Sequence, residues 1–183
     1  PRWSRGFRVP SRMYKRLSDR WEQMNFPLAA ESGEERVESL ILPIDDGADG
    51  REHVRAWVRM YRSTGKAVYA ALYSSHVSGG VRYMNIAFPL PFSQMTSILR
   101  LGNGTGDALV LTSWPGETAD AGDQGVYWVV RGRAIRLPIN ETITVWKEPG
   151  SPAGSLAARH DMWLFGTWFL TLDYRIFRKE TGR

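Results

Sequence analysis

The sequence predicts an all-β, mainly antiparallel protein whose strands close into an up-and-down β-barrel of about 8–10 strands. Between residues 36 and 178, apolar residues recur with the period of two that is typical of strands. Turn-forming clusters, such as Ser78-Gly79-Gly80 and Arg131-Gly132-Arg133, separate these runs. The connections are short, which favours antiparallel hairpins between neighbours. A chain of 183 residues suits one domain, 1–183, with its own core.

Residues 10–24 are expected to form a helix that packs on the barrel or caps one end of it. Ser11 is placed to cap its first turn. Apolar residues on one side recur at helical spacing, at Met13, Leu17, Trp21 and Met24. The helix is expected to end before Pro27, because a residue that precedes proline avoids the helical region.

Ten strands are expected to follow the helix and to form the barrel over residues 36–178. So many consecutive strands are better accommodated by closure than by an open sheet, because closure removes unpaired edges. The predicted strands span residues 36–42, 52–62, 66–76, 80–88, 94–101, 107–114, 125–131, 134–146, 158–165 and 168–178.

A helix followed by a meander of strands is similar to the architecture of lipocalin-type barrels. That resemblance implies a lipocalin-like interior able to hold one small apolar molecule. The Gly-x-Trp signature of lipocalins belongs at the first strand after the helix. Here Gly166-Thr167-Trp168 falls in the last hairpin, which speaks against membership of the family itself. The resemblance is therefore one of architecture.

The positive charge of the chain lies in its first 20 residues. The net charge is +5, but residues 1–20 alone carry seven cationic side chains and one acidic side chain. Residues 2–20 could therefore contact anionic lipid as a peripheral membrane arm. No base-reading module is recognisable, so nucleic acid is disfavoured as a partner. The apolar stripe of the helix suits packing on the barrel or a homodimer contact.

The composition excludes several classes of site. With no cysteine there is no disulfide, thiolate metal site or cysteine nucleophile. The three histidines are scattered and no glycine-rich phosphate loop is present, so no metal or cofactor is expected. A secretory signal is not recognisable, and no apolar run reaches the roughly 18 residues of a membrane span. These features predict a cytoplasmic protein, and 20 arginines against four lysines indicate a GC-rich, bacterial coding sequence.

Glu141 is the least expected residue of the sequence. In the predicted strand 134–146 it shares the odd-numbered face with Ile135, Leu137, Ile139, Ile143 and Val145. A carboxylate on a buried apolar face needs a partner, or its pKa rises until the group is neutral. A carboxyl group with a raised pKa can serve as a general acid or base.

Three interpretations of Glu141 remain open from the sequence. Pro138 could impose a bulge that turns Glu141 outward. Glu141 could form a structural ion pair with an inward arginine, for which Arg82 is the natural candidate. In the functional interpretation Glu141 is a catalytic acid or base, Arg82 holds a substrate oxygen, and His160 or Tyr174 assists by hydrogen bonding.

The residues expected to line the interior are apolar or aromatic. Inward aromatic side chains can fill a core or contact a planar apolar ligand. The predicted ligand-binding residues are Tyr174, Trp168, Phe88, Met84, Met60 and Ile143. The sequence thus predicts a protein that binds a hydrophobic small molecule inside a β-barrel. If it is an enzyme, a cofactor-independent isomerase or cyclase with a buried carboxylate is expected, and a non-catalytic carrier is the alternative.

Overall fold

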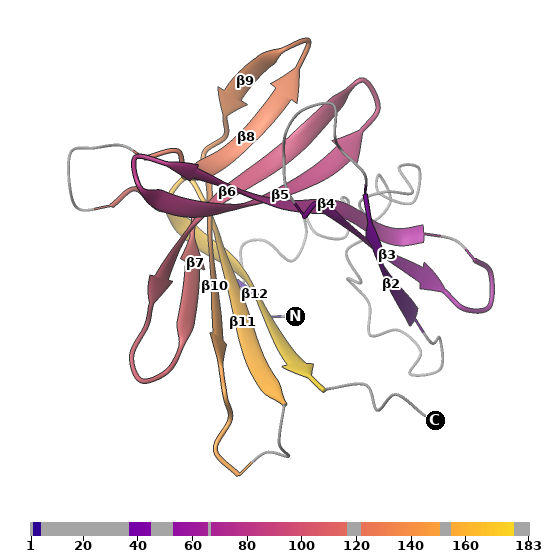
Figure 1. The fold of residues 1–183 in the computed structure, drawn as a ribbon, viewed down its shortest axis with the longest axis vertical. Coiled ribbons are helices and arrows are strands. Elements are labelled where there is room, and N and C mark those ends of the chain that lie inside the picture. Colours follow the sequence, from indigo (N-terminus) through magenta and orange to yellow (C-terminus); the bar gives the residue numbers. More distant parts are fainter. Residues whose placement is uncertain are drawn as a thin grey trace.

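The computed structural model describes residues 2–4, 37–44, 53–65, 67–116, 122–150 and 155–177. These residues form antiparallel strands, and no helix is present among them (Figure 1). The strands are β1 (Arg2–Trp3), β2 (Val37–Pro43), β3 (Arg55–Tyr61), β4 (Ala67–Ser78), β5 (Val81–Leu90), β6 (Ser93–Asn103), β7 (Leu109–Thr112), β8 (Gly125–Val130), β9 (Arg133–Arg136), β10 (Ile139–Trp146), β11 (Leu156–Leu164) and β12 (Thr167–Ile176). The all-β prediction is confirmed, whereas the predicted helix over 10–24 lies outside the described residues.

The strands form one sheet in the order β1-β12-β11-β10-β7-β6-β5-β4-β3-β2. Strand β6 is a branch point, because its first half, Ser93–Ile98, pairs with β8 and its end, Arg100–Asn103, pairs with β7. The β8–β9 hairpin leaves the main path there (Figure 1). The sheet is therefore a meander with one branch.

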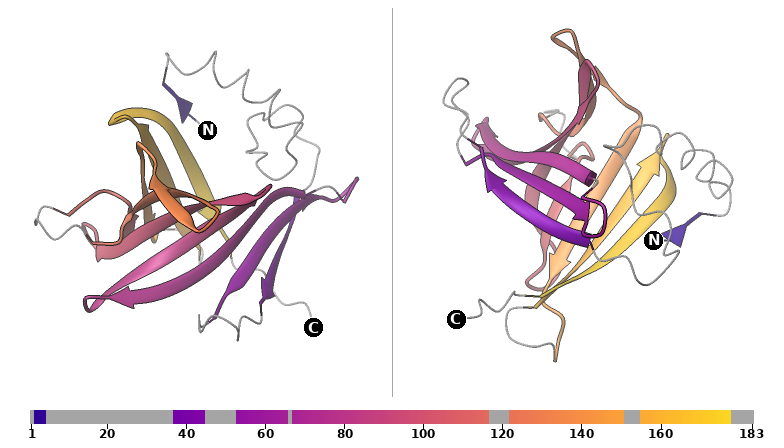
Figure 2. Two further views of the ribbon diagram at one scale, coloured as in Figure 1. Left: turned by 90° about the horizontal axis from the view of Figure 1, so that it is seen from above. Right: turned by 90° about the vertical axis from the view of Figure 1, so that its right-hand side faces the viewer.

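The predicted closed barrel is not confirmed. Strands β1 and β2 are the two ends of the strand order, and no pairing joins them among the described residues. The sheet is nevertheless strongly curved, so that β2–β4 and β10–β12 form two walls (Figure 2). Sheet twist and coiling bring distant strands toward one another without the hydrogen bonds that closure requires.

Two-residue turns in the left-handed region connect three of the hairpins. Gly79-Gly80, Arg131-Gly132 and Phe165-Gly166 all have positive φ at both positions. This geometry matches the right-handed twist of the flanking strands, and glycine adopts it without the penalty that a Cβ imposes. The turns at Gly79-Gly80 and Arg131-Gly132 were expected from the sequence, and they set the register of the strands that they join.

Pro138 divides the strand that the sequence predicted over 134–146. Strand β9 ends at Arg136 and pairs with β8, whereas β10 begins at Ile139 and pairs with β7 and β11. The proline has no N–H for a ladder bond, and its carbonyl accepts from the Phe165 N–H at 2.8 Å. The break changes the partner strands but does not turn Glu141 outward, since Glu141 is 7% exposed.

Strand β1 was not expected as a strand. Arg2 and Trp3 pair with Thr171 and Leu170 of β12, and the Ser4 N–H donates to the Phe169 carbonyl. Two residues are too short to show a period of two, so only the tertiary contact reveals this strand.

The core lies on the face of the sheet that carries Leu99, which we call the inner face. Leu99 is fully buried at 0% exposure, and buried Ala71, Ile86 and Leu111 surround it. The half-buried side chains that pack against these four residues are Tyr69, Tyr73, Met84, Phe88, Leu101 and Ile143. The opposite face of the sheet is the outer face. Met84, Phe88 and Ile143 therefore lie where the sequence placed them.

Strand β3 presents to the inner face the residues that the sequence assigned to the outside. In the β3–β4 register Trp57 pairs with Ala71, and Arg59 pairs with Tyr69, so both side chains share the inner face. Met60 alternates to the outer face, which corrects its prediction as a ligand-binding residue. In this strand the apolar residues at even positions, Val54 to Met60, alternate with four larger residues at odd positions, Arg55 to Tyr61. Alternation alone does not show which of the two sets faces inward.

A β-bulge removes Trp168 from the inner face. The register shifts between Met162, which pairs with Leu170, and Trp163, which pairs with Trp168, leaving Phe169 as an extra residue in β12. The indole N–H of Trp168 donates to the Thr171 hydroxyl of the outer face at 2.9 Å. The prediction that Trp168 lines the interior is wrong, because an extra residue reverses the alternation on one side of it.

Candidate functional site

The side chain of Glu141 on β10 forms an ion pair with His160 on β11. The Oε2 atom of Glu141 lies 2.5 Å from Nε2 of His160. In the register of these strands Glu141 pairs with Met162 and His160 with Ile143, so the two are diagonal neighbours on the inner face. Their side chains are 10% and 14% exposed, respectively, so the pair is nearly withdrawn from solvent.

His160 decides the ionisation state of Glu141. Desolvation of the buried carboxyl group alone would raise the pKa of Glu141. The hydrogen bond and charge of His160, together with a hydrogen bond from Ser97, outweigh desolvation and hold the pKa below its ordinary value. Glu141 is therefore a carboxylate at neutral pH, and its partner is a histidine in place of the expected arginine.

Ser113 fixes the backbone of Glu141 at the end of β7. The Ser113 hydroxyl accepts from the Glu141 N–H at 2.8 Å, and the Ser113 N–H donates to the Glu141 carbonyl at 3.0 Å. Ser113 is fully buried at 0% exposure. These bonds continue the β7–β10 pairing by one residue after Thr112, so the strand position that carries the carboxylate is rigidly held.

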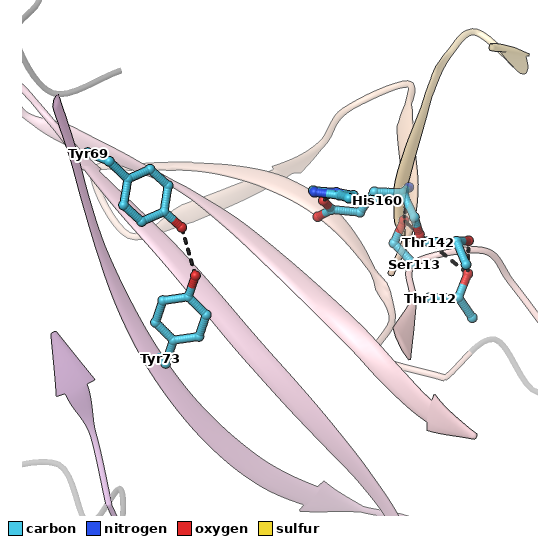
Figure 3. A network of polar contacts seen from close by, with 7 residues as sticks. Tyr69, Tyr73, Thr112, Ser113, Thr142 and His160 are labelled. Carbon is cyan, nitrogen blue, oxygen red and sulfur yellow. Dashed lines mark hydrogen bonds and ion pairs between the residues drawn. The ribbon is translucent and has the colours of Figure 1, made fainter. Parts of the chain in front are cut away.

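Two tyrosines of β4 face the Glu141–His160 pair. The hydroxyls of Tyr69 and Tyr73 lie 2.7 Å apart, and Figure 3 shows them on one wall with His160 on the opposite wall. Desolvation by burial raises the pKa of both hydroxyls, and the charge of Glu141 raises each further. Both tyrosines are therefore neutral hydrogen-bonding groups within electrostatic reach of the carboxylate.

Tyr174 of β12 lies within reach of the same groups. Burial raises the pKa of its hydroxyl to about 12, although 39% of the residue is exposed. The charges of Arg59 on β3 and Glu141 on β10 also act on this hydroxyl. Residues from the two walls of the sheet thus influence one another across the inner face, as its curvature requires.

Aromatic rings form the wall beside the tyrosine hydroxyls. Trp57 contacts Tyr69 and Tyr73 with ring centroids 5.5 and 5.9 Å apart, and Phe88 contacts Tyr69 edge-on at 5.6 Å. Such contacts orient the rings and leave flat apolar surface beside a few polar atoms. A surface of this composition is typical of small-molecule sites.

Two buried donors on β3 lack a hydrogen-bonding partner in the part of the chain that the structure describes. They are Nε1 of Trp57 and Nε of Arg59, both on the inner face. An unpaired buried donor costs about 1–3 kcal/mol, so such groups are uncommon in folded proteins. Sequence reasoning missed both residues, because it placed the apolar series of β3 inside.

Arg82 does not take part in this site. It is exposed near the β4–β5 turn, and its guanidinium donates to the Ser75 hydroxyl at 3.4 Å. The expectation that Arg82 pairs with Glu141 is wrong. Arg82 lies at the beginning of β5, where this strand extends beyond the core. Of the three residues predicted as catalytic, the structure brings together Glu141 and His160.

A second histidine lies in a separate cluster on the outer face. Nδ1 of His76 lies 3.0 Å from Asn85 Oδ1, Nε2 lies 3.0 Å from Asp123 Oδ2, and the ring stacks on Tyr83. Hydrogen bonds from His76 and then Ser78 lower the pKa of Asp123. Both ring nitrogens are occupied, so this cluster joins the segment before β8 to the β4–β5 hairpin and leaves His76 unavailable to a ligand.

Comparison with known proteins yields one relative and no family assignment. The chain is 39% identical over 174 residues to a Bacillus subtilis (strain 168) protein named "Uncharacterized membrane protein YndJ". The match covers 95% of this chain but 30% of that protein, so the chain corresponds to less than a third of its relative. No family model and no solved structure matches the chain.

Two classes of feature are absent from the described residues. A helix long and apolar enough to cross a membrane is not found in this part of the chain. No group of three or more histidine, aspartate or glutamate side chains within the described ranges is arranged to hold a metal ion.

Proposed function

We propose that the protein binds a hydrophobic small molecule against the inner face of the curved sheet. The observation that carries this proposal is the ion pair of Glu141 and His160 among half-buried aromatic and aliphatic side chains. In this proposal the sheet surrounds the ligand as the wall of a barrel would. Closure of the sheet into a complete barrel, which the sequence predicts, remains part of the proposal. The cytoplasmic location predicted from the sequence is also retained as a proposal.

The proposed chemistry is a proton transfer at a carbon or oxygen of the bound molecule, as in an isomerisation or cyclisation. His160 would move the proton, because Glu141 holds it by Nε2 and no described residue bonds its Nδ1 atom. Glu141, kept ionised, would orient the ring and stabilise its protonated form, which makes it a positioning residue. A carrier without catalysis would use the same face without proton transfer.

Binding is expected to be detectable with N-phenyl-1-naphthylamine, a neutral dye whose fluorescence rises in apolar surroundings. Phe88→Ala should weaken its affinity about fivefold, because the aromatic wall beside Tyr69 is lost. Phe92→Ala is the matched control, since Phe92 is 98% exposed in the β5–β6 turn and should have no effect. The absence of saturable binding, or an equal effect of both variants, would contradict the proposed site.

Catalysis is tested on the small molecules that copurify with the protein, identified by mass spectrometry. In D₂O, proton transfer at carbon is expected to increase the mass of the converted molecule by deuterium incorporation. His160→Asn should retain dye binding and abolish that incorporation. Binding with no conversion of any copurifying molecule, in wild type and variant alike, would favour the carrier.

The relative's name favours a second candidate function, contact with a membrane surface through residues 2–20. Within this arm the structure describes Arg2, which is paired with Asp173 of β12 at 3.0 Å, and the sequence places six further basic residues at positions 5–20. Attraction to anionic headgroups contributes about 1 kcal/mol per basic residue near the surface.

Cosedimentation with vesicles tests this candidate. Wild-type protein should sediment with phosphatidylglycerol vesicles and remain in solution with phosphatidylcholine vesicles. Arg12→Glu combined with Arg16→Glu should abolish sedimentation, whereas the same charge change at Arg131 and Arg133, both exposed in or beside the β8–β9 turn, should not. Equal loss in the two double variants would show that net charge, and not the arm, determines the interaction.

A further inference from the structure

We propose that Arg59 and Trp57 on β3 bind an oxyanion head group of the ligand, so that the ligand is an amphipathic molecule with an apolar body and one acidic group. The inference rests on the proposed binding function and adds the chemical class of the molecule. It starts from the arrangement of polar atoms around the two side chains.

The guanidinium of Arg59 is a cation without a carboxylate partner among the residues that the structure describes. Its Nε is buried and makes no hydrogen bond to a described residue, although a guanidinium offers five donors. The acid that shares the inner face, Glu141, is already paired with His160. Among the described residues, the positive charge of Arg59 therefore lies on a half-buried face with no carboxylate paired to it.

Trp57 adds a second donor on the same side of the same strand. Side chains two residues apart in a strand lie about 7 Å from each other and point in the same direction. The indole N–H of Trp57 is buried and has no hydrogen-bonding partner in the described ranges, as is true of Nε of Arg59. One molecule that bears two or three acceptor oxygens could satisfy both donors, as a carboxylate or phosphate does.

The tyrosine pair contributes a third donor. In the 2.7 Å contact between Tyr69 and Tyr73, one hydroxyl hydrogen is donated to the other oxygen, which leaves one hydroxyl hydrogen without an acceptor among the described residues. Arg59 is paired with Tyr69 in the sheet register, and Trp57 contacts both rings. Three donors thus lie on β3 and β4 on the inner face, and one of them, Arg59, is also a cation.

This arrangement orients the ligand. The acidic head group lies at β3, the apolar body extends along Phe88, Met84 and Ile143, and the far part reaches His160 on the opposite wall. Recognition of one end by charge and of the body by apolar contact is how small-molecule sites combine affinity with orientation.

Two dyes with the same ring system separate head-group recognition from apolar binding. They are 8-anilinonaphthalene-1-sulfonate, which carries a sulfonate, and the neutral N-phenyl-1-naphthylamine. Arg59→Met keeps most of the apolar stem and removes the charge. It is expected to weaken the affinity for the sulfonate dye about tenfold and to leave that for the neutral dye within about twofold. Arg55→Met is the matched control, because Arg55 lies on the same face of β3 but is exposed.

Two gentler variants keep the test valid if Arg59→Met does not fold, which its circular dichroism and melting curve would show. Trp57→Phe keeps an aromatic ring at this position and removes the N–H, and should weaken binding of the sulfonate dye more than that of the neutral dye. Arg59→Lys retains the charge and should weaken it less than Arg59→Met. Displacement of the neutral dye by dodecanoate or dodecyl phosphate, compared with dodecan-1-ol, tests the head group and separates carboxylate from phosphate.

The outcomes distinguish this inference from the proposed function. If wild-type protein binds neither dye, the proposed function itself fails. If the neutral dye binds but Arg59→Met affects both dyes equally, or neither, the head-group site is overturned while apolar binding stands. Equal displacement by the alcohol and the two acids would overturn it as well.

Discussion

Glu141→Gln is expected to lower the free energy of unfolding by about 3 kcal/mol, because it leaves His160 without its carboxylate inside the sheet. The pair is nearly buried and its two atoms lie 2.5 Å apart, so solvent does little to replace the lost interaction. Urea denaturation of the wild type and variant, with equal m-values, would measure the difference. The glutamine retains the shape of the side chain, so a cavity does not contribute.

A double-mutant cycle separates the pair from other effects of the substitution. His160→Gln and the double variant complete the cycle, and the double variant should cost about 2 kcal/mol less than the two single changes added together. Additive effects would show that Glu141 and His160 do not stabilise one another, and the proposed chemistry would lose its basis.

The same variant should alter the acid dependence of stability. The folded-state pKa of Glu141 is below the ordinary value of 4.5, so the unfolded chain binds more protons in this range. The contribution of Glu141 is therefore complete above pH of about 4.5 and is lost as the pH falls through the lowered pKa. Glu141→Gln should therefore lose less stability than wild type on acidification. Asp173→Asn is the comparison at an exposed position, because Arg159 and Arg2 lower the pKa of Asp173 in the same direction.

Leu99→Ala is expected to cost about 3 kcal/mol, the middle of the range for a fully buried leucine. Leu99 is 0% exposed at the place where β6 changes partner from β8 to β7. Ala71, Ile86 and Leu111 surround it, and a cavity there would remove contacts from all of them. For a domain of this size the midpoint temperature should fall by roughly 6–12 °C, as measured by circular dichroism.

Leu109→Ala is the matched control for Leu99→Ala. It deletes the same atoms from a residue that is 41% exposed on β7, and should cost less than about 1 kcal/mol. Equal losses at the two positions would mean that the face carrying Leu99 is not the core. The neutral dye should still bind Leu99→Ala, because Leu99 is fully buried, and aromatic side chains such as Phe88 pack against its cluster.

The sequence by itself determined the local features of this protein. Alternation of apolar residues and turn chemistry predicted most strands to within a few residues, because both depend on neighbours along the chain. The same reasoning placed Glu141 on a buried face and grouped Met84, Phe88 and Ile143 with it. It also named His160, whose position in β11 follows from the same period.

The tertiary structure decided everything that depends on which strands meet. Glu141 pairs with His160 because β10 lies beside β11 with a register that makes them diagonal neighbours, whereas Arg82 extends past the core. One extra residue in β12 reversed Trp168, and curvature of the sheet selected the Trp57 and Arg59 side of β3 as the inner one. Alternation states that a strand has two faces; only pairing with distant strands, which is non-local, decides which of them is the inner face, and on β3 the outer face still holds the buried Ala56.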